Sequence, residues 1–242
     1  ERGKQLQSLM HRVELVVGRN LPRVGLSATL GDMKMASNFL CPRRAGGVKV
    51  IESKNAGQTL QIQVKGYIQS PMRKLLEARG EPEPDSDDEP EDQDSPDFAI
   101  AEHLYKVLRG SNNLVFPNSR TQVESFADRL RRCCERDAVP NEFWPHHGSL
   151  SKDLREQAEH ALKSGEFPAT GICTSTLELG IDIGSIKNVV QIGCPPSVAS
   201  LRQRLGRSGR RAGEPAILRA YCKEQPLTTG SSLSDQLRQG LV

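Results

Sequence analysis

The sequence lacks three features that mark specialised classes of protein. It has no run of eighteen apolar residues, and its opening residues, ERGK, do not resemble a signal peptide, which argues against a membrane or secreted protein. No Cys-x-x-Cys pair occurs among its six cysteines, so neither a zinc cage nor a disulfide framework is indicated. We therefore expect a cytoplasmic globular protein with reduced cysteines and no membrane partner.

One long stretch of the sequence has no Lys or Arg. Residues 81–97 hold ten carboxylates and no aromatic residue, so they cannot bury enough apolar surface to fold. We expect residues 71–97 to be a disordered insertion or linker whose charges are simply solvated. The rest of the chain carries 33 basic and 20 acidic residues, a net charge of +13. This charge makes nucleic acid a candidate partner, although a merely soluble basic surface accounts for it equally well.

Residues 1–70 are predicted to form part of a first domain. Apolar residues recur at helical spacing between residues 6 and 17, and Val24-Gly25-Leu26 predicts a short buried strand. A short helix is expected from about residue 32, with Asp32 as its N-cap. Residues 60–68 alternate between apolar and polar side chains, the period of a half-buried strand. We expect that strand to close the first domain.

Helices and strands alternate from residue 98 onward. Strands are predicted near residues 114–116, 171–173, 189–192 and 216–221, with helices between them. This alternation predicts β-α-β units and a parallel sheet that is covered on both faces. We expect one complete doubly wound domain at residues 98–225, followed by a polar tail. Its functional residues should lie on loops at the carboxyl ends of the strands.

The strongest local motif is QRLGRSGRR at residues 203–211. This string and the residue before it contain five arginines and no acidic residue. Guanidinium groups are always charged and donate paired hydrogen bonds to phosphate. Arg204, Arg207 and Arg211 would share one face of a helix, but the two glycines in the string make a continuous helix costly. The motif indicates a phosphate-binding cluster, and the alternative is a basic surface loop.

A second motif, TSTLELGIDIG, occupies residues 174–184 directly after a predicted strand. A strand-to-helix junction exposes backbone N–H groups that suit an anion. The hydroxyls of Thr174 and Ser175 could donate to a phosphate backbone, and Asp182 could accept from a sugar hydroxyl. Helix capping by the hydroxyls and a turn at Gly184 explain the same residues equally well.

The adjacent His146 and His147 raise the question of a metal site. Neighbouring side chains on a strand point in opposite directions, and no third ligand lies at a suitable spacing. We therefore expect no metal here. A nucleic-acid contact or a satisfied polar turn is favoured instead.

Together, these motifs resemble those of superfamily-two DEAD/DEAH-box helicases in order and spacing. Residues 27–29 (SAT) resemble motif III, residues 114–120 motif IV, residues 174–184 motif V and residues 203–210 motif VI. The strings ERGKQLQSL, VGLSATLGDM and LELGID are most similar to the large helicase-related (Lhr-like) group. The resemblance implies an α/β fold, in which a complete RecA-like domain with a doubly wound parallel sheet follows the C-terminal part of a first RecA-like domain.

The resemblance also implies an ATP-dependent motor that acts on nucleic acid. ATP with Mg²⁺ would lie between two RecA-like domains, and Arg207 and Arg210 would act as arginine fingers at the γ-phosphate. Gly180 and Asp182 would contact the nucleotide. The partner would be single-stranded or partly duplex nucleic acid, with DNA favoured over RNA.

Two further sets of roles follow from the same resemblance. The residues that couple hydrolysis to strand movement would be Ser27, Thr29, Gln203 and Arg204. The residues that contact the sugar-phosphate backbone would be Asn118, Ser119, His147, Gly148 and Thr174. Because backbone contacts carry no base information, we expect binding that weakens steeply with salt and discriminates little between sequences.

The sequence contains no G-x-x-x-x-G-K-[ST] phosphate loop and no Asp-Glu-x-His or Asp-Glu-x-Asp motif for Mg²⁺. These elements are expected to precede Glu1, so we expect the chain alone not to hydrolyse ATP. Motif VI begins with Gln203, where many relatives have His, and this disfavours a narrow DEAD-box assignment. Two alternatives to a helicase are a translocase subunit of a restriction or defence complex and a non-catalytic nucleic-acid-binding module.

Overall fold

The chain divides into two compact units, Glu1–Ala56 and Gly57–Val242. The computed structural model describes residues 2–27, 31–42, 47–51, 59–68, 95–178, 183–211, 213–227 and 230–241. The predictions for Thr29, Gly180 and Asp182, and for most of residues 71–97, lie outside the described residues.

The first unit contains two helices, α1 (Arg2–Val17) and α2 (Met33–Leu40). The predicted cap of α2 is confirmed, because Asp32 Oδ1 accepts a hydrogen bond of 2.9 Å from the backbone N–H of Met35. The predicted buried strand is wrong, since Val24 is 85% exposed and Leu26 94% exposed. A buried strand needs a neighbouring strand for its backbone hydrogen bonds, and the described residues of this unit contain none.

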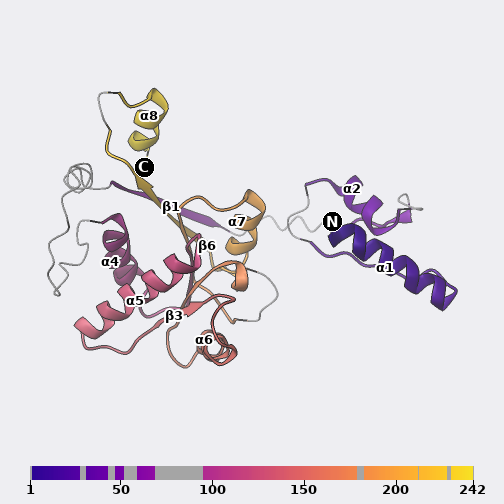
Figure 1. Ribbon diagram of the computed structural model, residues 1–242, viewed down its shortest axis with the longest axis horizontal. Helices are drawn as coiled ribbons and strands as arrows, with labels where there is room; N and C mark the ends of the chain where they lie inside the picture. Colours follow the sequence, from indigo (N-terminus) through magenta and orange to yellow (C-terminus); the bar gives the residue numbers. More distant parts are fainter. Residues whose placement is uncertain are drawn as a thin grey trace. The chain divides into compact units, whose positions relative to one another are not determined.

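The second unit is built on a six-stranded sheet with the order β1-β6-β5-β2-β4-β3 (Figure 1). Every neighbouring pair of strands is parallel, which confirms the predicted RecA-like, doubly wound sheet. The strands are β1 (Leu60–Ile68), β2 (Asn113–Phe116), β3 (Phe143–His146), β4 (Thr170–Cys173), β5 (Asn188–Ile192) and β6 (Ala216–Glu224). The helices are α4 (Pro96–Leu108), α5 (Arg120–Arg136), α6 (Lys152–Ser164), α7 (Val198–Leu205) and α8 (Leu233–Leu241), with a short 3-10 helix, η2 (Ser175–Leu177).

Apolar side chains from alternate positions of the central strands enter two different cores. Val115 and Val190 pack with the buried residues of α4 and α5. Their neighbours Leu114, Phe116 and Val189 pack on the other face with residues of α6 and the α7 region. Because successive side chains of a strand point to opposite faces, continuous apolar runs such as NLVF produce a sheet buried on both sides.

The strand at residues 60–68 belongs to the second unit, which corrects the prediction that it closes the first domain. β1 pairs in parallel with β6 along its whole length, from Leu60 opposite Ala216 to Ile68 opposite Glu224. A period of two shows that a strand has one half-buried face, but it does not identify the partner strand. Only the pairing with β6 shows where this strand lies.

Helix α4 begins earlier than predicted, inside the acidic stretch. Ser95 is its N-cap and accepts a hydrogen bond of 3.1 Å from the backbone N–H of Phe98, and Pro96 occupies the first turn. Asp97 also lies in the first turn and forms an ion pair with Lys223 of β6. A hydroxyl cap followed by proline and a carboxylate favours a helix start, so residues 95–97 are excluded from the predicted linker.

The predicted polar tail contains helix α8. Among the described residues, no helix combines the length and apolar character that a membrane span requires.

Candidate nucleic-acid and nucleotide site

The loops that follow β2, β3, β4 and β5 all lie at one edge of the sheet, because parallel strands have their carboxyl ends on the same side. We call this the carboxyl edge. The structure places all five residues predicted to contact the nucleic acid there, on the first three of these loops. These residues are Asn118, Ser119, His147, Gly148 and Thr174. Ligands bind at this edge of open α/β sheets.

Asn118 is an exposed side chain held in a defined orientation at this edge. Its Nδ2 donates a hydrogen bond of 2.9 Å to the carbonyl of Cys194, and its backbone N–H donates to Gln122 at 3.1 Å. Position 193 favours glycine, because its φ is +71° and a Cβ would lie 2.8 Å from Asn118 Nδ2. Ser119 caps α5 by accepting from the N–H of Gln122 at 3.2 Å.

The two histidines at the end of β3, His146 in the strand and His147 directly after it, are both buried. His146 contacts Thr176 Oγ1 at 2.8 Å through Nδ1 and Glu159 Oε1 at 2.9 Å through Nε2. His147 is 1% exposed, and its Nε2 lies 3.0 Å from Glu124 Oε1. A nucleic-acid strand could therefore contact the exposed backbone at Gly148 but not the buried ring of His147. The described residues contain no group of three side chains that could hold a metal ion.

Thr174 directly follows β4, and its side chain is half-buried. It occupies the N-cap position of η2, but its hydroxyl makes no capping hydrogen bond. This disfavours the capping role, and the phosphate contact of Thr174 stays a prediction. Gly184, at the end of the same motif, has a φ of +72° and therefore forms the turn that its residue type allowed.

The arginine-rich motif begins in α7 and leaves it at Gly206, the C-cap of the helix. Arg207, Arg210 and Arg211 therefore lie in a loop and do not continue the helical face of Arg204. The cost of glycine in a helix accounts for this ending. The final arginine, Arg211, lines a separate cavity of about 700 Å³ at the opposite edge of the sheet.

Arg204 is 3% exposed and surrounded by partners. Its Nε donates to Glu178 Oε2 at 3.1 Å, and its Nη1 donates to Gln191 Oε1 at 2.6 Å. Its guanidinium carbon lies 4.6 Å from the ring centroid of Phe116, a cation–π distance. Burial of a charge at this depth requires such pairing.

Arg207 and Arg210 are close together but differ in exposure. Arg207 is 8% exposed and donates twice to the carbonyl of Glu178, from Nη2 at 2.8 Å and from Nε at 3.2 Å. Burial and the nearby charge of Arg210 lower the pKa of Arg207. Arg210 is exposed, and its Nε donates to the carbonyl of Gly206 at 3.3 Å. Two guanidinium groups that repel each other in this way form a site that favours an anion.

Sequence reasoning missed Glu178 and Gln191, which both bind Arg204. Gln191 is 1% exposed and follows two valines in strand β5. A polar side chain inside a buried strand needs a buried partner, and this was the available indication. Glu178 lies within the motif at residues 174–184, but nothing in the sequence shows that its carboxylate and its carbonyl bind two different arginines.

The predicted coupling residues are distributed over both units. Ser27 belongs to the first unit, whereas Gln203 and Arg204 lie on α7 of the second. Gln203 is half-buried. A coupling role for Ser27, Gln203 and Arg204 stays a prediction.

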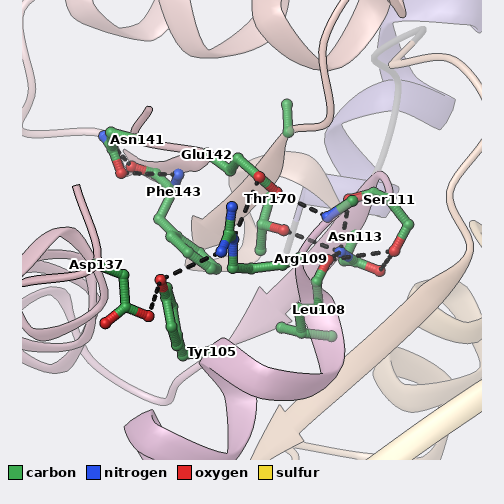
Figure 2. Close-up of polar contacts among 12 residues, drawn as sticks. Tyr105, Leu108, Arg109, Ser111, Asn113, Asp137, Asn141, Glu142, Phe143 and Thr170 are labelled. Carbon is green, nitrogen blue, oxygen red and sulfur yellow. Dashed lines mark hydrogen bonds and ion pairs between the residues drawn. The ribbon is translucent and has the colours of Figure 1, made fainter. Parts of the chain in front are cut away.

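The opposite, amino edge of the sheet carries a different polar network (Figure 2). Asn113, at the start of β2, donates through Nδ2 to the carbonyl of Leu108 at 2.7 Å and to Thr170 Oγ1 at 2.9 Å. Its Oδ1 accepts from Asn188 Nδ2 at 2.7 Å. These bonds join α4, β2, β4 and β5 in the interior.

A second part of this network connects α4 to the end of α5 and the start of β3. Tyr105 donates to Asp137 Oδ2 at 2.7 Å, and the backbone N–H of Gly110 donates to Glu142 Oε2 at 2.9 Å (Figure 2). Arg109 lies 5.3 Å from the centroid of the Tyr105 ring and 3.5 Å from Glu142. Burial, followed by the hydrogen bond to Asp137, raises the pKa of Tyr105 to about 12.

Comparison with known proteins identifies this fold. Residues 98–212 match the family described as the helicase conserved C-terminal domain. The chain is 30% identical to the ATP-dependent helicase Lhr-Core of Sulfolobus acidocaldarius over 88% of its own length and 23% of the relative's. The helicase Lhr of Mycobacterium smegmatis, solved with ssDNA and AMP-PNP, is 29% identical with a TM-score of 0.69, and the match covers 91% of this chain and 26% of that one.

A more distant structure shows how general the architecture is. Dbp5 of S. cerevisiae shares the fold at 18% identity with a TM-score of 0.57, covering 82% of this chain and 44% of that one. The chain spans only 23% of the Lhr-Core protein, so the match concerns one part of that relative. The chain belongs to the Lhr-like helicases of superfamily two, and residues 98–212 form its helicase C-terminal domain.

Proposed function

We propose that the whole protein is an ATP-dependent helicase or translocase and that this chain supplies the second half of its motor. The adjacent guanidinium groups of Arg207 and Arg210 carry the proposal. Burial and, after it, the charge of Arg210 lower the pKa of Arg207, and a pair of repelling cations is stabilised by a ligand with several negative charges. A triphosphate bound against the loop after α7 meets that requirement.

The residues present fit ATP as the cofactor. Arg210, which is exposed, and Arg207, after release from the Glu178 carbonyl, would bind the terminal phosphate and stabilise the charge that develops there. ATP hydrolysis, with Mg²⁺, supplies the free energy for movement along the strand. The phosphate loop and the Mg²⁺ motif are absent from the 242-residue sequence, so we expect negligible ATP hydrolysis by this chain alone.

The carboxyl edge is the proposed surface for the nucleic-acid backbone. Asn118 offers an exposed amide, Thr174 a hydroxyl without a capping bond, and Gly148 exposed backbone. The similarity to the Mycobacterium smegmatis Lhr, solved with ssDNA, favours DNA over RNA. All three contacts address phosphate or sugar, so binding should depend on salt more than on sequence.

The test is ATP hydrolysis by the full-length protein, measured without nucleic acid, with single-stranded DNA and with single-stranded RNA. We expect strong stimulation by DNA and weaker stimulation by RNA. A full-length protein that binds DNA but never hydrolyses ATP would support a non-catalytic binding module instead. Unwinding of a forked duplex separates a helicase from a translocase that moves without strand separation.

A further inference from the structure

We propose that Gln191 is a positioning residue that transmits nucleic-acid binding at Asn118 to the arginines of the motif VI loop. This inference rests on the proposed motor function. It assigns a role to a buried side chain of β5 that lies outside the residues proposed to bind the nucleotide or the nucleic acid.

The first half of the path joins Asn118 to Arg204 through the amide of Gln191. Gln191 Nε2 lies 3.3 Å from Asn118 Oδ1, 3.2 Å from the carbonyl of Phe116 and 3.1 Å from the carbonyl of Ile192. An amide has two N–H groups, so three acceptors compete for two donors. A ligand that pulls on Asn118 therefore changes how the Gln191 amide is shared.

The second half joins Gln191 to Arg207. Gln191 Oε1 accepts from Arg204 Nη1 at 2.6 Å, and Arg204 Nε donates to the Glu178 carboxylate at 3.1 Å. The carbonyl of the same Glu178 holds Arg207 at 2.8 and 3.2 Å. Because both groups belong to one residue, a shift of the Glu178 carboxylate also shifts the carbonyl that holds Arg207.

Burial makes this path respond as a unit. Gln191 and Arg204 are 1% and 3% exposed, and Glu178 is 8% exposed, so no bulk water replaces a broken bond. Leaving a buried charge or amide unpaired is costly, and the group is instead expected to exchange one complete set of partners for another. Such a two-arrangement element is what coupling between distant sites requires.

Asn188 provides a matched comparison within the same strand. It is also a buried amide, 2% exposed, and its Oδ1 also accepts from an arginine, Arg219 Nε at 3.2 Å. Its Nδ2 donates to Asn113, so its contacts end in the amino-edge network. Asn188 thus has the burial and chemistry of Gln191 without the connection to Asn118 and Glu178.

The test compares Gln191→Met and Asn188→Leu in the full-length protein. We measure ATP hydrolysis with and without oligo(dT), the Kd for oligo(dT) and the midpoint of thermal unfolding. Both variants should unfold at lower temperature. Only Gln191→Met should reduce the ratio of DNA-stimulated to unstimulated hydrolysis, by about tenfold, the size expected for one hydrogen bond to a charged group.

The Kd for oligo(dT) separates coupling from simple loss of binding. We expect it to change by less than about threefold in Gln191→Met, because Gln191 makes no strand contact. Gln191→Glu is the second variant: it keeps an acceptor for Arg204 and loses the amide donors, so it should also reduce the ratio.

Three results overturn the inference. A normal ratio in both Gln191 variants shows that the path carries no coupling. An equal loss of the ratio in Asn188→Leu shows a general structural effect. A wild-type protein without DNA-stimulated hydrolysis overturns the proposed motor function together with this inference, whereas the first two results leave that function intact.

Discussion

The two edges of the parallel sheet use polar side chains in different ways. At the amino edge, Asn113, Asn188 and Tyr105 bond to groups of neighbouring elements, so their hydrogen bonds end inside the protein. At the carboxyl edge, the bonds of Asn118 and Thr174 leave a side chain that still faces solvent. The difference shows that the amino-edge side chains join strands and helices, whereas the carboxyl edge keeps polar groups that the proposed ligands would use.

The largest effect that would sharpen this comparison is expected at Arg207. In the full-length protein, Arg207→Ala should lower DNA-stimulated ATP hydrolysis by about 10³-fold, the magnitude of a lost arginine finger. Binding of single-stranded DNA should be largely retained, because the loop after α7 makes none of the proposed strand contacts. Steady-state ATPase assays and fluorescence anisotropy measure the two quantities.

Arg211→Ala is the control for this prediction. Arg211 lies in the same loop, its side chain is 72% exposed, and its nearest carboxylate, that of Glu214, is 3.9 Å away. We expect ATP hydrolysis within about twofold of wild type, because an exposed pair contributes little. Survival of hydrolysis in Arg207→Ala would remove the arginine-finger role.

The next largest effect should be on stability at the amino edge. Asn113→Ala removes an amide that bonds to Leu108, Thr170 and Asn188, and buried groups left without partners should cost about 3 kcal/mol. Urea unfolding of the chain measures this change. Equal destabilisation by Thr174→Val, for which we expect less than about 0.5 kcal/mol, would break the proposed division between the edges.

Tyr105 predicts how the amino edge responds to pH. Its pKa is raised to about 12 in the folded protein, above about 10 in an unfolded chain. The folded state therefore holds the proton more tightly, and this stabilisation is complete below about pH 10 and is lost as the pH rises toward 12. Tyr105→Phe should cost about 1 kcal/mol at pH 8 and less at pH 11, as measured by urea unfolding. A cost independent of pH would contradict this, while Tyr221, whose pKa is also raised to about 12, keeps some pH dependence in the variant.

The smallest effect is expected at the carboxyl edge itself. Thr174→Val should weaken single-stranded DNA binding by about fivefold through loss of one hydroxyl contact. The melting temperature should stay unchanged, because the hydroxyl makes no capping bond with η2. A lower melting temperature with unchanged DNA affinity would assign Thr174 to the fold.

The sequence predicted the sheet well and the arginines only in part. Alternating helices and apolar strands were enough for the parallel sheet of the second unit, because each unit of the pattern is local. The partner of β1 was missed because period-two alternation carries no information on pairing. The direction of Arg207 was also missed: it depends on the carbonyl of Glu178, 29 residues away in the chain, and no local pattern encodes that contact.

The prediction of the site was also limited because the sequence does not show which polar side chains become buried. His147 was expected to contact the strand, but its ring is 1% exposed, and burial depends on α5, which supplies Glu124. The role of Gln191 was missed because its partners, Arg204 and Asn118, are 13 and 73 residues away in the sequence. The burial of His147 and the partners of Gln191 both depend on long-range packing, whereas the loop positions of Asn118 and Thr174 followed directly from the strand ends.

The pairing of β1 with β6 has a consequence for how this domain tolerates change. β1 is fixed by nine residue pairs with β6, and α4 is fixed by its own cap and core contacts. The chain between them joins two anchored ends, and doubling the length of such a connection costs only about 0.6 kcal/mol. Lengthening the connection should therefore leave the pairing of β1 with β6 intact, which makes it a suitable position for a tag or an inserted domain.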